Sequence, residues 1–406
     1  MADELGEAWL TIVGIGEDGP AGLSAASRDA LARAEWVTGA ARHLALLADV
    51  LADLAADVVP WPVPFADGIA PLLARRGRRV VVLVSGDPFW FGAGSVVTRT
   101  LAAGEWVAHP VPSTFALAAA RLGWAIETTA CLGLHAAPLA RLRTVVAPGV
   151  RAIVLLRDGA AVAALARYLA ELGFGESDLW VLEALGGPRE RVRRVTAAGF
   201  ALGDIAHPVA VGVLVRGAGA VVPTAAGRPD AWFAHDGQIT KRPVRALTLS
   251  ALAPRPFETL WDIGAGSGSI AIEWLLAHPT TQAVAFETNP VRADRMRGNA
   301  DALGVDRLGV VVARAPEGLA GHSFPDAVFI GGGVSAAMLG WLWANLPAST
   351  RLVANAVTLE SEALLALWQG LKGGDLLRIA LSEVAPIGTR RGWRAHYPIV
   401  QWSVTL

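Results

Sequence analysis

The sequence predicts an α/β protein with two domains. At 406 residues the chain is too long for one ordinary hydrophobic core, and two domains of about 200 residues each are expected. Hydrophobic residues make up 53% of the chain and charged residues only 17%, so large buried sheets are favoured and disorder is not expected. In the second half, short apolar runs alternate regularly with helical segments. This pattern is typical of a doubly wound parallel sheet, which binds ligands at the carboxyl ends of its strands.

Apolar runs and helical segments are also mixed through the first two hundred residues. Arg79–Val84 is a near-continuous apolar run, as expected of a strand that is buried on both faces. Helices are expected over Gly22–Arg33, Gly92–Ala103 and Ala160–Leu172. The other expected strands of this half are Leu10–Val13, Trp106–Ala108, Arg151–Leu156, Leu179–Leu182 and His207–Val215.

A stretch of Gly, Ala, Pro and Thr, Arg216–Pro229, follows the last of these strands and shows no sustained periodicity. Such a composition is typical of a linker. We therefore expect a first domain over residues 1–215, a linker over residues 216–233 and a second domain over residues 234–406.

The second domain shows the clearest alternation of strand and helix. Its expected parallel strands are Thr259–Ile263, Ala283–Glu287, Gly309–Ala313, Ala327–Ile330 and Arg351–Ala354. The helices expected between or after them are Ser269–Ala277, Val291–Leu303, Ser335–Asn345 and Ser361–Leu371. Two last segments, Leu376–Glu383 and His396–Val404, are expected to close the sheet as an antiparallel pair.

Charge and cysteine content argue against several classes of protein. The net charge is −1, whereas a general nucleic-acid binder usually carries a basic excess. Every apolar stretch is interrupted before it reaches about 18 residues, the length that indicates a membrane span. Met1–Gly6 contains two acidic residues and lacks the basic start of a secretory signal. Cys131 is the only cysteine and no metal-ligand cluster is evident, so we expect a cytoplasmic protein without metal or membrane.

The sharpest motif lies where the strand Thr259–Ile263 turns into a helix. It reads Trp-Asp-Ile-Gly-Ala-Gly-Ser-Gly-Ser over residues 261–269. Glycine at such a turn lets the backbone approach a ligand closely. A dinucleotide-binding loop would have glycine at position 269, where this chain has serine. Glu287 ends the next strand, where a carboxylate can accept hydrogen bonds from both hydroxyls of a ribose.

This pattern resembles motif I of the class I S-adenosylmethionine methyltransferases. The resemblance implies a Rossmann-like domain in which Glu287 holds the cofactor ribose. The fourth strand ends in Phe-Ile-Gly-Gly-Gly and lacks the Asn/Asp-Pro-Pro-Tyr-like motif of the amino-directed nucleic-acid methyltransferases, so a DNA or RNA substrate is disfavoured. The loop residues that the resemblance assigns to cofactor binding are Asp262, Gly264, Ala265, Gly266, Ser267 and Gly268.

Three other features of the second domain resemble the decarboxylating precorrin methyltransferases. Arg-Ala-Pro-Glu at 314–317 is similar to an Asp-Ala-Pro-Glu stretch that lies beside the cofactor adenine in that family. Because Arg stands here in place of Asp, the resemblance implies only a backbone contact with the cofactor, at Ala315. Ile-Thr-Lys at 239–241 resembles a Met-Thr-Lys segment that folds over the cofactor, which implies that Thr240 contacts it. Asp326 corresponds by spacing to an acid near that family's active site, and it is the candidate proton-handling residue.

The first domain contains an independent set of motifs. Gly14 lies in a generic glycine turn after the first strand. Ser-Gly-Asp-Pro-Phe-Trp-Phe-Gly at 85–92 follows a buried strand and resembles the Gly-Asp-Pro-Phe signature of the tetrapyrrole (precorrin and uroporphyrin) methylases. That family folds as two αβα subdomains with the cofactor between them.

A Pro-Ser-Thr sequence at 112–114, before the next expected helix, is similar to the proline and paired hydroxyl residues of the same family. Helix N-termini offer free amide donors, which suit a cofactor carboxylate or adenine edge. The cofactor contacts that the resemblance implies in this domain are Gly14, Gly86, Asp87, Trp90, Ser113, Thr114 and, as an apolar contact, Leu156.

The order of the two domains is more specific than either alone. It is similar to the precorrin-6Y C5,15-methyltransferase (decarboxylating) family of cobalamin biosynthesis, over nearly the whole chain. The resemblance implies methylation of a reduced precorrin-6 at C5 and C15, with loss of carbon dioxide from the ring C acetate, to give precorrin-8. The first domain would methylate C5, and the second would methylate C15 and decarboxylate. S-Adenosylmethionine would bind at two sites per chain, and the enzyme would be a homo-oligomer.

A substrate with several carboxylates needs cations near its pocket, and arginine forks match carboxylate geometry. The candidates for this role are Lys241, Arg242, Arg390, Arg391 and Arg394. Three histidines, His135, His207 and His396, are interpreted as structural or exposed. Two other functions stay open from the sequence alone: a cofactor-sensing or scaffold protein in which one half no longer catalyses, and an NAD-dependent oxidoreductase. The residues also do not decide between the oxygen-dependent and the cobalt-early pathway.

Overall fold

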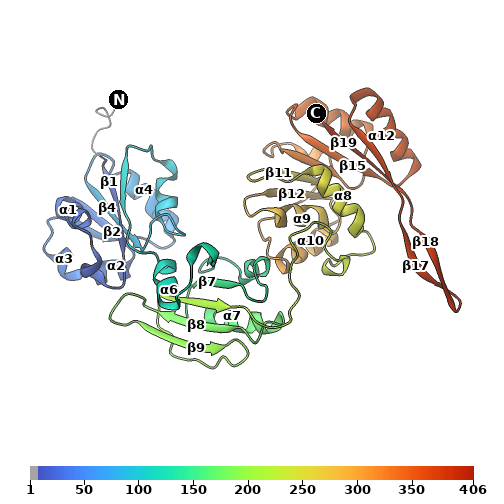
Figure 1. Ribbon diagram of the computed structural model, residues 1–406. Helices are drawn as coiled ribbons and strands as arrows, with labels where there is room; N and C mark the ends of the chain where they lie inside the picture. Colours follow the sequence, from blue (N-terminus) through green and yellow to red (C-terminus); the bar gives the residue numbers. More distant parts are fainter. Residues whose placement is uncertain (1–7) are drawn as a thin grey trace. The chain divides into compact units, whose positions relative to one another are not determined.

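The computed structural model describes residues 8–406, so the segment Met1–Gly6 lies outside the described residues. The described chain forms two compact units, both with the α/β structure that the sequence predicts (Figure 1). The first unit contains the chain before Pro138 together with Ala147–Ala220. The second contains Pro138–Val146 together with Val221–Leu406.

A parallel five-stranded sheet with the order β3-β2-β4-β1-β5 forms one half of the first unit. Its central strands are β1 (Leu10–Ile15) and β4 (Val80–Ser85). Alternate residues of these strands belong to apolar cores on opposite faces of the sheet, which explains the near-continuous apolar run of β4. The other elements of this half are β2 (Trp36–Gly39), β3 (Asp57–Pro60), β5 (Trp106–His109), α1 (Ala25–Arg33), α2 (Ala41–Leu46), α3 (Ala48–Ala52), α4 (Ile69–Leu73) and α5 (Gly94–Val97).

The other half of the first unit is a mixed sheet with the order β6-β7-β10-β8-β9. Its central strand β10 (Val209–Leu214) pairs antiparallel with both β7 and β8. A buried core joins this sheet to α6 (Thr114–Leu122) through Phe115, Ile153 and Leu182. The remaining elements are β6 (Ala130–Gly133), β7 (Arg151–Leu156), β8 (Asp178–Glu183), β9 (Arg191–Thr196) and α7 (Gly159–Glu171).

The second unit contains a seven-stranded sheet with the order β13-β12-β11-β14-β15-β19-β16. Its first five strands are parallel, and β19 pairs antiparallel with β15 and β16. Apolar cores cover both faces, as expected for a doubly wound sheet. The strands are β11 (Thr259–Ile263), β12 (Gln282–Glu287), β13 (Gly309–Val312), β14 (Ala327–Ile330), β15 (Arg351–Ala356), β16 (Asp375–Ile379) and β19 (Ile399–Thr405). The helices are α8 (Arg242–Leu252), α9 (Ser269–Ala277), α10 (Pro290–Ala302), α11 (Ala336–Asn345) and α12 (Leu359–Lys372).

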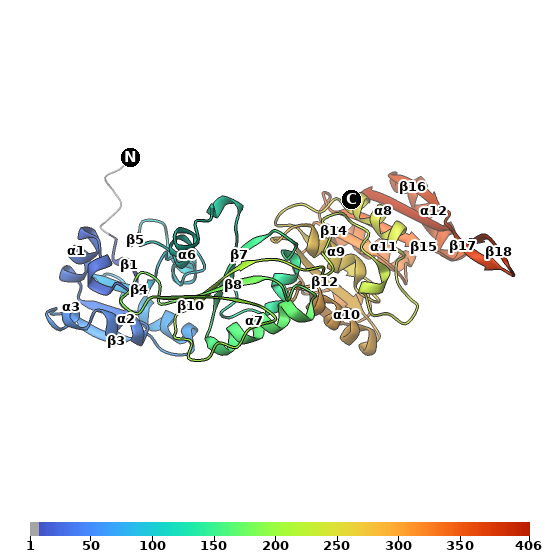
Figure 2. The same cartoon turned by 60° about the horizontal axis from the view of Figure 1, so that its bottom comes forward.

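The predicted closing antiparallel pair is confirmed as β16 and β19, but a hairpin lies between them in the sequence. Its strands, β17 (Ser382–Ile387) and β18 (Arg390–Ala395), pair only with each other. Figure 2 shows them projecting from the rest of the second unit. The predicted strand His396–Val404 begins late, at Ile399, and Pro398, directly before it, has no N–H to donate to a ladder.

An ion cluster around the buried Glu273 lies in the core of the second unit. Both carboxylate oxygens of Glu273, on α9, are occupied: they accept from the backbone N–H groups of Gly227 and Arg228 at 2.7 and 2.9 Å. The guanidinium groups of Arg228 and Arg245 donate to the same carboxylate at 3.2 and 2.7 Å, and Arg245 also reaches Asp230 at 2.9 Å. Arg228 lies within the segment predicted as a linker, and its side chain is nevertheless almost completely buried.

Residues 8–406 lack two features that would indicate other functions. Within that range, no helix is both long and apolar enough to cross a membrane. The same residues contain no group of three or more His, Cys, Asp or Glu side chains placed to hold a metal ion.

Most predicted strands and helices are confirmed, and β14 and α9 have their predicted bounds. The helix predicted over Gly92–Ala103 is wrong in length, because α5 spans only Gly94–Val97 and a 3₁₀ turn follows. The consecutive β-branched residues Val96, Val97 and Thr98 explain this, since they lower helix propensity.

Candidate functional site

The glycine loop of the second unit connects β11 to α9 and has an unusual backbone. Gly264, Gly266 and Gly268 have φ values of 69°, 58° and 74°, in the left-handed region that favours glycine. A Cβ atom at Gly264 would lie 2.8 Å from the carbonyl oxygen of Gly332, so that position must lack a side chain. At Gly266 the nearest atom to a Cβ would be 3.8 Å away, so the loop faces open space there.

Glu287, at the end of β12, holds this loop in place. Its Oε2 atom accepts a hydrogen bond from the backbone N–H of Gly266 at 2.9 Å, and Oε1 accepts from that of Asn289 at 2.9 Å. A carboxylate oxygen has about two lone-pair directions, so Oε2 can accept one further hydrogen bond from a ligand. Oε1 also accepts from the Thr288 hydroxyl at 3.4 Å, a long hydrogen bond that a ligand can replace. The side chain therefore fits the ribose-binding role expected of it.

A cavity of about 1330 Å³ lies at the carboxyl ends of the parallel strands of this sheet. Its apolar lining includes Ile263, Phe286 and Phe329, at the ends of three neighbouring strands. The predicted residues that line it are Thr240, Lys241, Gly264, Ala265, Gly266, Ser267, Glu287 and Ala315.

The segment at 237–241 forms another wall of this cavity and is anchored at both ends. At one end, Asp236 accepts a hydrogen bond from Arg292 of α10 at 2.8 Å, and this contact lowers the pKa of the Asp236 carboxyl to about 2. At the other end, the buried Arg245 donates to the carbonyl oxygen of Thr240. The anchors place Thr240 and Lys241 opposite the glycine loop.

The first unit contains a cavity of about 670 Å³, which both of its sheets line. Ile15 and Ser85, at the ends of β1 and β4, come from the parallel sheet, and Leu182 and Val209 come from the mixed sheet. The predicted residues that line it are Gly86, Asp87, Trp90, Ser113, Thr114 and Leu156.

Local hydrogen bonds and ring packing fix the loops around this cavity. Ser113 caps α6, since its hydroxyl accepts from the N–H of Ala116 at 3.1 Å. Asp87 Oδ1 accepts from the N–H of Phe89 at 2.8 Å. Trp90 stacks on the buried Phe115 with ring centroids 5.2 Å apart, which gives the cavity an apolar wall.

A polar cluster at the same cavity was not expected from the sequence. Arg42 donates to Glu17, and also to the hydroxyl of Ser85 at 2.9 Å. His43 Nε2 lies 2.9 Å from the same hydroxyl and 3.0 Å from the Arg42 guanidinium. Burial and the charge of Arg42 lower the pKa of His43 to about 4, so its imidazole is neutral near pH 7.

The comparisons with known proteins agree with this two-part arrangement. Residues 9–201 match the family of tetrapyrrole (corrin/porphyrin) methylases, and residues 231–406 match a precorrin methyltransferase domain. Precorrin-6Y C(5,15)-methyltransferase [decarboxylating] from a Sinorhizobium species is 48% identical over 98% of this chain and 96% of its own length. The enzyme of the same name from Mycobacterium tuberculosis is 42% identical over 98% of this chain and 99% of its own length.

This chain belongs to the precorrin-6Y C5,15-methyltransferase (decarboxylating) family. A crystal structure of the C-terminal domain of precorrin-6Y C5,15-methyltransferase from Rhodobacter capsulatus is also similar. It is 49% identical, covers 46% of this chain and 100% of that chain, and gives a TM-score of 0.44.

Three residues that the family resemblance assigned to cofactor binding lie outside the cavities. Asp262 is buried behind the glycine loop, where Oδ2 accepts from the N–H of Ala271 at 3.1 Å. Gly268 packs against Met296 of α10, 2.3 Å from where its Cβ would be. At Gly14 a Cβ atom would lie 2.1 Å from the carbonyl oxygen of Gly86, so this glycine permits loop packing.

The structure contradicts the placement of Asp326 near the active site. Asp326 directly precedes β14, so it lies at the amino end of a parallel strand, whereas the cavity lies at the carboxyl ends. Its Oδ2 atom accepts from the N–H of Thr259, at the start of the neighbouring β11, at 2.8 Å. The residue joins two strand starts, and this geometry removes the support for a proton-handling role.

Four of the five cations expected at the substrate pocket also lie outside it. Arg390, Arg391 and Arg394 are exposed on the projecting strand β18, and Arg242 is exposed at the start of α8. Only Lys241 lines the cavity among these candidates. Cavity residues that sequence reasoning missed include Arg292, Arg314, Asn355 and Tyr397, and His396, interpreted as structural or exposed, also lines this cavity.

Proposed function

We propose that this chain methylates a reduced precorrin-6 at C5 and C15 and removes carbon dioxide from the ring C acetate, giving precorrin-8 in cobalamin biosynthesis. The observation that carries the proposal is the full-length similarity to decarboxylating precorrin-6Y C(5,15)-methyltransferases, together with a separate cavity in each half. The N-terminal half methylates C5. The C-terminal half methylates C15 and decarboxylates, in line with its match to a precorrin methyltransferase domain.

The proposal includes two S-adenosylmethionine sites per chain. In the C-terminal half, the open glycine loop and the free lone pairs of Glu287 fit a nucleoside. In the N-terminal half, Gly86 and Ser113 line a cavity that has an apolar wall at Trp90. When bound, S-adenosylmethionine supplies a methyl group that its sulfonium has already activated.

The residues of the chain then have mainly to position the substrate. A bridging carbon of a reduced tetrapyrrole is an enamine-type nucleophile, so alignment of carbon, methyl and sulfur is the main requirement. Orientation of this kind contributes up to about 7–11 kcal/mol to catalysis. Lys241, Arg292 and Arg314 line the larger cavity, and their proposed role is to hold substrate carboxylates there, Arg292 with the donors that its pair with Asp236 leaves over.

Decarboxylation needs an electron sink, and the conjugated macrocycle provides one. Phe286, Phe329 and Ile263 make part of the cavity wall apolar. A water-poor wall of this kind favours loss of a carboxylate charge.

The decisive experiment is incubation of the protein with reduced precorrin-6 and S-adenosylmethionine labelled in its methyl group. We expect two labelled methyl groups, at C5 and C15, and one molecule of carbon dioxide for each product molecule. A product with fewer methyl groups, or with its acetate retained, would contradict the proposal.

Calorimetry separates this proposal from its two rivals. We expect two S-adenosylmethionine molecules per chain, whereas a scaffold role for one half predicts one. Binding of NADH in place of S-adenosylmethionine would favour an oxidoreductase. Ser269, where a dinucleotide loop has glycine, argues against that outcome.

A further inference from the structure

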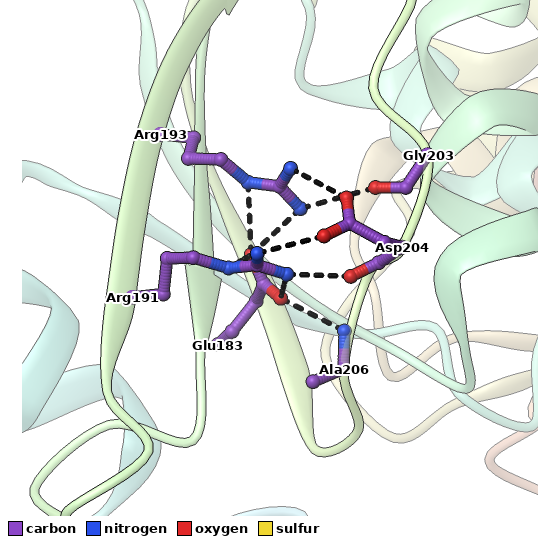
Figure 3. Close-up of polar contacts among 6 residues, drawn as sticks. All are labelled: Glu183, Arg191, Arg193, Gly203, Asp204 and Ala206. Carbon is purple, nitrogen blue, oxygen red and sulfur yellow. Dashed lines mark hydrogen bonds and ion pairs between the residues drawn. The ribbon is translucent and has the colours of Figure 1, made fainter.

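A cluster of charged side chains in the first unit surrounds the segment that leads into β10 (Figure 3). Glu183, at the end of β8, has 0% of its surface exposed. Its carboxylate accepts four hydrogen bonds from Arg191 and Arg193 of β9, at 2.7, 2.9, 3.1 and 3.1 Å. Both guanidinium groups also donate to the carboxylate of Asp204, at 2.9 and 3.0 Å. The two guanidinium groups and the two carboxylates therefore form a cluster with no net charge.

The same cluster binds the backbone of the segment directly. Glu183 accepts from the N–H of Ala206 at 2.8 Å, and Arg193 donates to the carbonyl oxygen of Gly203 at 3.3 Å. Asp204 has φ of 49°, a left-handed conformation that is unfavourable for a residue with a side chain. Such backbone persists where its surroundings over-determine it, and this is common at functional sites. The segment 203–206 is thus held in one conformation.

His207 follows this segment immediately and lines the cavity of the first unit. Its Nδ1 atom lies 2.9 Å from the carbonyl oxygen of Arg157, directly after β7. A carbonyl oxygen can only accept, so Nδ1 carries the hydrogen. The neutral imidazole therefore has its basic lone pair on Nε2.

The other two histidines at this cavity are less suitable as bases. His43 Nε2 lies 3.0 Å from the guanidinium of Arg42, which only donates, so its lone pair is already engaged. His135 is exposed, as His207 is, but no hydrogen bond to another described residue fixes its tautomer. Only His207 combines a fixed tautomer with an available ring nitrogen among the described histidines of the cavity.

The methylation proposed for this half requires a proton acceptor. The electron pair of the bridging carbon forms the new carbon–carbon bond, while the pair of the broken carbon–sulfur bond stays on sulfur. The methylated macrocycle is then cationic, and loss of one proton returns an electron pair to its conjugated system. No oxidant or reductant is needed, but the proton must leave.

We propose that His207 is this acceptor and takes the proton on Nε2 during C5 methylation. The inference rests on the proposed function, because it assigns C5 chemistry to this cavity. The cluster around Glu183 acts as a positioning group, which holds the imidazole at the cavity wall.

The variant His207→Asn tests the inference, because the asparagine amide can still donate to the Arg157 carbonyl but has no Nε2. We expect kcat for C5 methylation to fall at least about 100-fold, the lower range for loss of a general base. S-Adenosylmethionine binding by calorimetry and the melting temperature should stay unchanged. The matched control, His109→Asn at the end of β5, in the same unit but not among the residues that line the cavity, should keep its rate. Equal rates for wild type and His207→Asn would overturn the proposal.

Chemical rescue separates proton transfer from a structural role. Added imidazole should raise the rate of His207→Gly and leave that of wild type unchanged. A His207→Gly variant that binds S-adenosylmethionine but gains no rate from imidazole would contradict proton transfer. If wild type itself does not methylate C5, the proposed function fails, which is a different outcome from failure of His207.

The tautomer gives a readout that is independent of activity. With ¹⁵N-labelled histidine, the His207 signals, assigned by their loss in His207→Asn, should show the hydrogen on Nδ1 at a pH where the ring is neutral. Signals of the opposite tautomer would overturn the inference, since Nε2 would then carry a hydrogen and have no lone pair to offer.

Discussion

The two cavities differ in how their walls are built. In the second unit, one sheet supplies the floor at the carboxyl ends of its parallel strands, and a single carboxylate, Glu287, fixes the glycine loop. In the first unit, two sheets supply opposite walls, and ion clusters around Glu17 and Glu183 fix the loops. A site on one sheet depends on one local turn, whereas a site between two sheets depends on contacts between remote segments. Changes at single residues should therefore act differently in the two units.

Glu287→Gln should have the largest effect and should separate the two sites. The amide loses the charge that favours two ribose hydrogen bonds, and bonds to charged groups contribute about 1.5–3 kcal/mol each. We expect at least about 100-fold weaker binding at the C-terminal site, so that calorimetry detects one tight S-adenosylmethionine site per chain. The control Glu360→Gln, an exposed carboxylate on α12, should keep two sites. Loss of both sites from Glu287→Gln would disprove their independence.

Asp262→Asn should change how the stability of the second unit depends on pH. Burial, with a contribution from the charge of Glu287, raises the pKa of Asp262 from 3.8 to about 7. Below about pH 4 the carboxyl is protonated in both the folded and the unfolded state. As the pH rises from there to 7, only the unfolded state loses the proton, so the free energy of unfolding falls.

A shift of one pKa unit corresponds to about 1.4 kcal/mol. Between pH 5 and pH 8, the unfolding free energy of the wild type should therefore fall by about 2–3 kcal/mol more than that of Asp262→Asn. Urea unfolding at the two pH values, followed by a probe attached only to the second unit, measures the difference. Equal pH dependence in the two proteins would show that the buried carboxyl stays charged.

Gly14→Ala should affect only the first unit. The new methyl group on β1 would lie 2.1 Å from the Gly86 carbonyl oxygen and 2.9 Å from the Val111 nitrogen, so the loop after β4 would have to move. Overpacking of this kind costs about 1–3 kcal/mol, and the shift should weaken cofactor binding at the N-terminal site. Gly298→Ala on α10, where a Cβ meets nothing within 4 Å, is the matched control and should not destabilise. Unchanged binding in Gly14→Ala would mean that the loop can move without loss.

Ser113→Ala should have the smallest effect, because it removes one cap of α6. The loss of the hydrogen bond to the Ala116 N–H should destabilise the first unit by about 1 kcal/mol. Thermal unfolding measures this change, and Ser24→Ala, which removes the equivalent cap of α1 away from the cavity, gives the comparison. If both variants lose the same stability but only Ser113→Ala binds S-adenosylmethionine more weakly, the hydroxyl at position 113 also serves the site.

In both halves the sequence predicted loops at strand ends that line the cavities, and it missed side chains that more remote segments bring there. The glycine loop and Glu287 follow or end two strands, β11 and β12, that are consecutive in the chain and adjacent in the sheet. Their separation along the sequence therefore predicts that they lie close together in the fold. Arg42 and His43 follow β2, a strand of four residues that is too short to show periodicity. His207 reaches its cavity through an ion cluster formed by β8, β9 and a loop, and no local pattern encodes that contact. Asp326 was misplaced because its role was carried over from the family spacing, although its position directly before the predicted strand Ala327–Ile330 already indicated the amino end of the sheet.

The buried carboxylate of Glu273 determines where the chain can be cut. A fragment that begins at residue 231, where the precorrin methyltransferase match starts, would lose Arg228 and the amide of Gly227 while it kept Glu273 in the interior. Arg245 would still pair with Glu273 at 2.7 Å, but the carboxylate would lose one guanidinium and two backbone donors, and hydrogen bonds to charged groups contribute about 1.5–3 kcal/mol each. A C-terminal fragment that is to keep this cluster must therefore start upstream of Gly227.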